Sequence, residues 1–317
     1  MSAFSRFFQS FGARASGLCL IAAALCLTTS CNRSSSIVVI EDQTQSEYAT
    51  ETVEQQFNVP LDVAAQQVAR RPVFDDKGVS VDLSDCGAFD GFTDEELARL
   101  PKIKVVRGAG PISVETLLAF TGRNELVEFL WIDAQLPDSA DARSAFKTLA
   151  GAPKLKKMRL AGLKLEDGSF PDYVLPALAS TPNLVELDIS GSAVNADALA
   201  AVDYNAGFLK LTKLNLYQTQ SGDNLLKAIA PLADRLTSLN LDDTQLSPES
   251  APALEEFSNL TFLHAGRSTL DDQCVESLAK LTKLEEIHVT RTNMTESGAD
   301  KLRAALPNCN VVSQPEN

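Results

Sequence analysis

The stretch LTSLNLDDTQL, Leu236–Leu246, places leucines at its first, fourth, sixth and eleventh positions and a threonine at its ninth. A helix face recurs every three to four residues and a half-buried strand alternates strictly, so neither pattern alone explains this spacing. Two other stretches follow it, LTKLNLYQTQS (Leu211–Ser221) and NLVELDISGSAV (Asn183–Val194, counted from Leu184). The stretch is therefore one copy of an internal repeat.

The repeat pattern is L-x-x-L-x-L-x-x-T/S-x-L, and it fits poorly near Gly78 and Ile103 but well further along the chain. The well-fitting copies comprise one at Leu126, where the fit is acceptable, and six where it is best, starting at Leu155, Leu184, Leu211, Leu236, Leu260 and Leu284. The last six starts are separated by 29, 27, 25, 24 and 24 residues. This array resembles the leucine-rich repeat family, whose periods run from about 20 to 29 residues. The resemblance covers about Val79 to Val312.

Each copy begins with a strand pattern. Because successive side chains of a strand point to opposite faces, Leu239 and Leu241 are expected to point into a core, and Ser238, Asn240 and Asp242 to point outward. The same positions in the other copies should form rows across a sheet. In this numbering, the third, fifth and seventh positions of every copy are predicted to lie on one exposed face.

A helix pattern follows each strand. SPESAPALEEF (Ser247–Phe257) opens with a favourable N-cap serine and a first-turn proline, and DDQCVESLAKL (Asp271–Leu281) repeats the arrangement. We therefore expect an α/β leucine-rich repeat solenoid, a horseshoe with a parallel sheet on the concave face and helices on the convex face. Many leucine-rich repeats carry Asn at the ninth position, where this chain has residues such as Thr244. The hydroxyl at this position should form a hydrogen bond with the backbone of the turn, as Asn would.

The N-terminal residues 1–30 have the features of a signal peptide. Arg6 and Arg14 precede the apolar run GLCLIAAALCL (Gly17–Leu27), which is too short to span a bilayer. LTTSC, ending at Cys31, resembles the lipobox of bacterial lipoproteins, although Thr28 stands where Leu is more usual; an ordinary cleaved signal is the alternative. The resemblance implies a lipidated Cys31 and, because Asn32 follows it, an outer-membrane rather than an inner-membrane address.

The remaining chain divides into three parts. Residues 31–58 are rich in Ser, Thr, Gln and Glu, which predicts a flexible tether. Residues 59–78 are predicted to form an N-terminal helical cap, because Pro60–Arg71 has helix-like apolar spacing and Pro72 ends it. Residues 79–317 should form the repeat domain with its C-terminal cap. Three cysteines, Cys86, Cys274 and Cys309, remain in the repeat domain. This odd number argues against a disulfide framework and indicates small buried thiols.

Composition argues against two classes of function. The 317-residue chain carries a formal charge of −14 and no basic run, so a phosphate backbone would be repelled and nucleic acid is not an expected partner. Gly108-Ala109-Gly110 lacks the third glycine of a dinucleotide-binding loop, and no Gly-x-Ser-x-Gly is present. We therefore expect a non-enzymatic protein without cofactors or a metal centre.

The concave face is predicted to bind a protein partner, because interfaces favour scattered aromatic and charged anchors. The predicted binding residues are Lys157, Arg159, Glu186, Asp188, Asn215, Tyr217, Asn240, Asp242, Phe262, His264, Glu286 and His288. Two alternatives remain open: an envelope scaffold in which the array is a rigid spacer, and a carbohydrate-binding module. Trp131 falls at an inward position, so few aromatic side chains are left for sugar stacking.

His264 and His288 are the two histidines of the chain, and they occupy the same position in successive copies. They should therefore lie side by side, with Glu286 on the same face. Three interpretations stay open: two solvated polar side chains, a pH-sensitive patch in which neighbouring imidazoliums repel, or a metal site. Three ligands without supporting outer groups would bind a metal weakly, and the sequence shows no such support.

The lipid anchor can be tested by replacing Cys31 with serine. The processed wild-type protein should partition into detergent, because two acyl signals suffice for stable anchoring. Cys31→Ser should yield a soluble or uncleaved form in the same Triton X-114 phase separation. Identical partitioning of both proteins would remove the lipoprotein assignment.

Overall fold

The computed structural model describes residues 71–86, 91–219 and 222–313, all within one compact unit that spans Gln66–Asn317. The predicted signal peptide, Cys31 and the tether lie outside the described residues. The same holds for the predicted helix Pro60–Arg71, except for Arg71 itself. Of the cap predicted over 59–78, the described residues 71–78 contain a short strand and a turn, with no helix.

The described residues form one eleven-stranded sheet whose strands follow chain order. They are β1 (Val73–Phe74), β2 (Ser80–Asp82), β3 (Val105–Pro111), β4 (Glu128–Gln135), β5 (Lys157–Leu160), β6 (Glu186–Asp188), β7 (Lys213–Asn215), β8 (Ser238–Asn240), β9 (Phe262–His264), β10 (Glu286–His288) and β11 (Asn310–Val312). β1 pairs antiparallel with β2, and every later pair is parallel.

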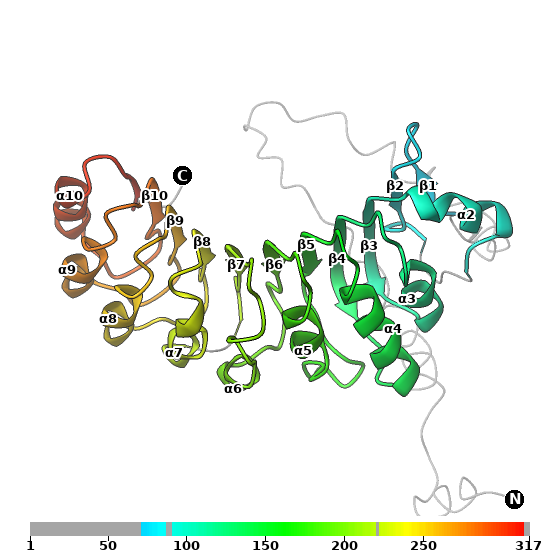
Figure 1. Ribbon diagram of the computed structural model, residues 1–317. Helices are drawn as coiled ribbons and strands as arrows, with labels where there is room; N and C mark the ends of the chain where they lie inside the picture. The colour runs from blue at the N-terminus through cyan, green and yellow to red at the C-terminus, as the bar shows by residue number, and fades with distance from the viewer. Residues whose placement is uncertain (1–70, 87–90, 220–221, 314–317) are drawn as a thin grey trace, which may run out of the picture. The chain divides into compact units, whose positions relative to one another are not determined.

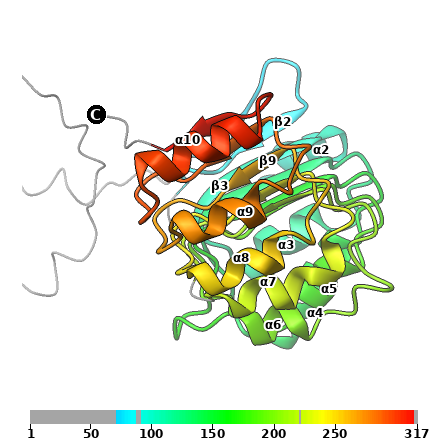
Figure 2. The ribbon, with the colours of Figure 1, turned by 90° about the vertical axis from the view of Figure 1, so that its left-hand side faces the viewer.

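Short helices connect the strands. The α-helices are α2 (Asp94–Arg99), α3 (Val114–Phe120), α4 (Ala140–Ala150), α5 (Val174–Ala179), α6 (Ala196–Ala200), α7 (Asn224–Ile229), α8 (Ala251–Leu254), α9 (Val275–Leu278) and α10 (Glu296–Ala305). Among the described residues, four 3₁₀ turns accompany them: η3 (Leu100–Lys102), η4 (Ala230–Leu232), η5 (Pro248–Ser250) and η6 (Asp272–Cys274). Within this unit the strands line the inner side of an arc and the helices its outer side (Figures 1 and 2). The predicted α/β leucine-rich repeat solenoid is confirmed.

The inward positions of the strands form a continuous core. The fourth and sixth residues of each copy are at most 3% exposed: Phe129, Trp131, Met158, Leu160, Leu187, Ile189, Leu214, Leu216, Leu239, Leu241, Leu263, Ala265, Ile287 and Val289. Ser238 and Asn240, the outward residues of β8, are partly exposed. The predicted inside and outside of the strand are therefore correct.

The repeat array includes the copy near Ile103, where the sequence pattern fits poorly. Gly108, in β3, stands at the sixth position of a copy that starts at Ile103, where other copies carry a large apolar residue. The Trp131 ring occupies the missing space, because a Cβ atom on Gly108 would lie 2.3 Å from it. Trp131 also stacks on Phe129 at 5.5 Å and donates its indole N–H to the Gly110 carbonyl at 2.8 Å. Gly108 therefore leaves room for the Trp131 ring in the core.

The predicted hydroxyl at the ninth position bonds the turn in the last four copies, whereas the Ser192 hydroxyl is buried without a hydrogen-bond partner. Thr219, Thr244, Ser268 and Thr292 each donate to the carbonyl three residues earlier, at 2.6–2.8 Å. The helix starts are also as expected, since the Ser247 side chain accepts from the Glu249 N–H and the Asp271 side chain from the Gln273 N–H. These segments begin as 3₁₀ turns and continue as single-turn α-helices, which makes them shorter than the sequence pattern suggests.

The eighth residue of every well-fitting copy adopts a left-handed backbone conformation. The residues are Asp133, Gly162, Gly191, Gln218, Asp243, Arg267 and Arg291, with φ from 50° to 69°. In five successive copies, from Gly162 to Arg267, the N–H of this residue donates to the seventh residue of the next copy, at 2.7–3.1 Å. The left-handed residue thus turns the chain out of the strand while keeping its N–H in the sheet ladder. Non-glycine residues pay about 1–2 kcal/mol for this conformation.

Two substitutions with opposite effects test this account. Gly191→Ala should destabilise the fold by about 1–2 kcal/mol, because the added Cβ must adopt the left-handed conformation, although its nearest neighbours are 3.7 Å away. Arg267→Gly should stabilise the fold by up to about 1 kcal/mol. Glycine removes the strain of the left-handed conformation, and this gain exceeds the cost of the greater entropy of glycine in the unfolded chain. Chemical denaturation measures both. A neutral Gly191→Ala would show that the conformation is not required.

Candidate functional site on the concave sheet face

The concave face consists of the third, fifth and seventh residues of each copy. Strand register aligns these positions across neighbouring repeats, so that Lys157 is opposite Glu186 and His264 is opposite His288. Ten of the twelve predicted binding residues lie within β5–β10, and Tyr217 and Asp242 follow β7 and β8 at the seventh position. The structure therefore places the predicted set in adjacent rows of one sheet face.

The charged residues of β5 and β6 pair with each other. Lys157 Nζ lies 2.6 Å from Glu186 Oε1, and Arg159 Nε lies 3.2 Å from Asp188 Oδ2. The basic residues of β5 and the acidic residues of β6 are therefore neighbours that neutralise each other. Such partly exposed pairs contribute about 0–1 kcal/mol to stability. They set a local charge pattern more than they hold the fold.

Three fifth-position residues, Asp188, Asn215 and Asn240, have a structural task. Each side-chain Oδ1 accepts a hydrogen bond from the backbone N–H two residues later, at 3.0 Å. Asp and Asn favour this local turn, which satisfies the N–H where the strand ends. Sequence reasoning predicted these residues as partner contacts and missed the turn. The recurrence of Asp or Asn at the fifth position was the available signal.

Aromatic rings gather at the C-terminal part of the concave face. The His264 and His288 rings are stacked, with centroids 4.0 Å apart and planes 26° apart. The Phe262 ring lies 4.5 Å from the His264 ring and 6.1 Å from the His288 ring. The prediction that the two histidines lie side by side is confirmed, and Phe262 covers one side of the pair.

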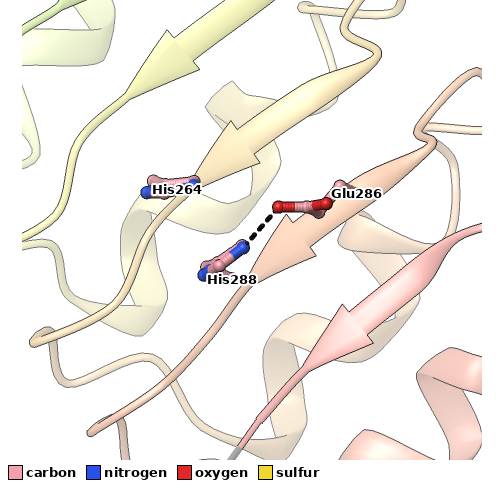
Figure 3. Close-up of side chains that lie close together, drawn as sticks. All are labelled: His264, Glu286 and His288. Carbon is pink, nitrogen blue, oxygen red and sulfur yellow. Dashed lines mark hydrogen bonds and ion pairs between the residues drawn. The ribbon is translucent and has the colours of Figure 1, made fainter. Parts of the chain in front are cut away.

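Each histidine has a carboxylate partner. His288 Nε2 lies 2.6 Å from Glu286 Oε1 on the same strand (Figure 3). His264 Nδ1 lies 3.5 Å from Asp242 Oδ2, which belongs to the preceding repeat. Asp242 is held in turn by the Gly266 N–H, which donates to Oδ1 at 2.6 Å. Burial acts to raise the pKa of Asp242, but the contacts from His264 and Gly266 outweigh it and lower the pKa.

A hollow between α4 and α5 on the helix side was not foreseen from sequence. It is lined by residues that include Arg143, Lys147 and Tyr173. Arg143 pairs with Asp138 and Asp172, both at 2.7 Å, and its guanidinium lies 4.9 Å from the Tyr173 ring centre. These charges are therefore engaged within the fold.

The three cysteines of the repeat domain are free thiols, as the sequence predicts. Cys86 and Cys274 are buried and Cys309 is partly buried, all three as free thiols. Burial raises the pKa of each thiol. This agrees with small buried thiols more than with reactive ones. None of the helices in the described part of the chain has the length and apolar character needed to cross a membrane.

Comparison with known proteins gives three solved structures of interest. The chain is similar to internalin C2 of Listeria monocytogenes, with 22% identity, 69% of this chain and 84% of that chain covered, and a TM-score of 0.48. It is also similar to a second internalin of that species, with 18% identity and a TM-score of 0.46; the match covers 71% of this chain and 59% of that chain. A leucine-rich repeat protein of Leptospira interrogans gives 16% identity, 69% and 57% covered, and a TM-score of 0.46. No protein family and no curated protein matches the chain. The fold assignment rests on the repeat geometry described above.

Asp242 is predicted to stabilise the concave face through its backbone contact. Asp242→Ala would leave the buried Gly266 N–H without its acceptor, and we expect a loss of about 1–3 kcal/mol in unfolding free energy. Ser238→Ala, on the same face of the same repeat, should change it by about 0.5 kcal/mol or less. Urea denaturation of both variants makes the comparison. Equal losses would show that the Gly266 contact carries no special weight.

Proposed function

We propose that the chain is a non-enzymatic leucine-rich repeat protein that is anchored to a membrane through Cys31 and binds a protein partner through its concave face. The observation that carries the proposal is the arrangement of exposed apolar and aromatic side chains on that face. Ile132, at the seventh position in β4, is 44% exposed, and Tyr217 and Phe262 are partly exposed further along. Aromatic and aliphatic anchors surrounded by polar groups are the usual composition of a protein-binding patch.

The paired charges of β5 and β6 support a role in orientation. Lys157, Arg159 and Glu186 remain partly exposed, so a partner can meet both signs of charge within two repeats. Electrostatic patterns of this kind contribute more to specificity and association rate than to affinity. In this proposal the aromatic side chains provide the binding free energy, and the charge pairs orient the partner on the concave face.

Location is the second part of the proposal. A lipidated Cys31 followed by the tether 31–58 would hold the repeat domain away from the membrane surface, in the cell envelope and at an outer rather than an inner membrane. The support is the sequence alone: the signal-like residues 1–30, the LTTSC stretch and the polar composition of the tether. The domain would then face partners at a distance from the bilayer.

A rigid envelope spacer is the competing function, and the internal pairing of the charges favours it. Lys157 with Glu186 and Arg159 with Asp188 satisfy one another without a partner. Carbohydrate binding has less support, since Trp131 is 3% exposed and its indole N–H is bonded within the fold. The spacer function predicts that substitutions on the concave face leave every interaction unchanged.

Site-specific photo-crosslinking in intact envelopes would separate the two functions. A photoreactive residue at position 238, in the centre of the concave face, should capture a defined protein. The same residue at position 118, which is an exposed leucine of α3 on the helix side, should not. Capture from position 118 alone, or from neither position, would favour the spacer.

Substitution of the aromatic anchors gives the quantitative test. Tyr217→Ala and Phe262→Ala should each weaken binding of the captured partner about fivefold or more, which is the loss expected of an interface residue worth over 1 kcal/mol. Leu118→Ala is the matched control and should have no effect. Binding measured by biolayer interferometry that is insensitive to both aromatic substitutions would contradict the proposal.

A further inference from the structure

The C-terminal part of the concave face brings three potential metal ligands together. His264, Glu286 and His288 offer ligand atoms that all lie within 4.8 Å of one another. Glu286 and His288 extend from β10 and His264 from β9, so the sheet register fixes the spacing of their backbones (Figure 3). Two imidazole nitrogens with one carboxylate oxygen form a donor set that suits zinc.

One atom of this group has no hydrogen-bond partner. His264 Nε2 is buried and unpaired, one of three such side-chain atoms among the described residues. The other ring nitrogen, Nδ1, faces Asp242. A buried polar atom without a partner is unfavourable and calls for an explanation, of which a bound ion is one. A metal ion at His264 Nε2 would satisfy it.

We propose that His264, Glu286 and His288 form a binding site for a divalent transition metal, with Zn²⁺ as the best-fitting ion. Imidazole nitrogens favour zinc over calcium and magnesium, which bind oxygen ligands. Three protein ligands leave the fourth tetrahedral position to water or to a group of another molecule. This inference concerns the ion alone and does not depend on the proposed protein partner.

The geometry requires a limited rearrangement. Zinc–nitrogen distances of about 2.0–2.1 Å place two tetrahedral ligand atoms about 3.4 Å apart. The most distant ligand atoms, now up to 4.8 Å apart, must therefore move closer, whereas Glu286 Oε1 must move away from His288 Nε2, to which it is hydrogen-bonded at 2.6 Å. The stacked rings must also turn, because a metal ion lies in the plane of each imidazole. Rotation of the side chains, which are 21–35% exposed, provides this movement without any change in the strands.

Asp242 supplies the outer support that the sequence alone did not reveal. Its Oδ2 faces His264 Nδ1 at 3.5 Å, on the far side of the ring from Nε2. The Gly266 N–H holds the same carboxylate at 2.6 Å. A carboxylate behind a ligating histidine fixes the tautomer and strengthens the ligand. The Phe262 ring, which packs against the His264 ring with a centroid distance of 4.5 Å, limits the orientations open to that ring.

Calorimetric titration of Zn²⁺ into the full chain, in detergent at neutral pH, tests the proposal. We expect one ion per chain. Asp242→Asn removes the carboxylate behind His264 and should lower the zinc affinity about 10–100-fold. His264→Ala and His288→Ala each remove a ligand and should lower the affinity by more than that. Ser238→Ala, on the same face of the preceding strand β8, and Cys309→Ser, a thiol next to β11, are the controls and should leave the affinity unchanged.

A spectroscopic measurement guards against unfolding of the variants. Co²⁺ in place of zinc should give the visible absorption of a tetrahedral nitrogen–oxygen site in the wild-type protein and lose it in Glu286→Gln, whose circular dichroism should match the wild type. Absence of zinc binding would overturn the proposal. So would binding that persists in both histidine variants, or binding lost in Cys309→Ser alone. The protein-partner experiments would be unaffected by either outcome.

Discussion

The backbone hydrogen bond from the eighth residue of one repeat to the seventh residue of the next sets the register of the sheet. It is possible because the eighth residue is left-handed, which keeps its N–H directed at the neighbouring repeat while the chain leaves the strand. Strands β5–β10 have only three or four residues each, so this extra bond is a substantial part of the five strand pairs from β5–β6 to β9–β10. Register, in turn, decides which side chains become neighbours on the concave face.

The same constraint has a cost at particular residues. Gly162 and Gly191 adopt the left-handed conformation without penalty, whereas Gln218, Arg267 and Arg291 do so with a Cβ atom. The array tolerates the strain because packing of the fourth and sixth residues continues through every repeat. In a solenoid, each repeat is stabilised by its two neighbours, so a local cost is shared along the stack.

Register also explains the chemistry of the concave face. Residues in the same row of successive repeats are held at the spacing of adjacent strands, about 4.8 Å. Lys157 therefore meets Glu186, and His264 meets His288. The first pair satisfies itself, whereas the histidine pair carries a carboxylate on each side and one unpaired ring nitrogen. This contrast makes the C-terminal part of the face chemically distinct from its centre.

The sequence by itself determined the repeat, the strand–helix order and the direction of each strand side chain, because alternation and period depend only on local spacing. It also placed His264 beside His288, since equal positions in successive copies must align. It lost the pattern near Ile103, because Gly108 breaks the rule and Trp131, one repeat later, restores the packing. Tertiary structure alone decided which polar side chains pair between repeats. Asp242 reaches Gly266 and His264 across a repeat boundary, and such contacts depend on side-chain conformations and neighbours about 24 residues away, which no local pattern encodes.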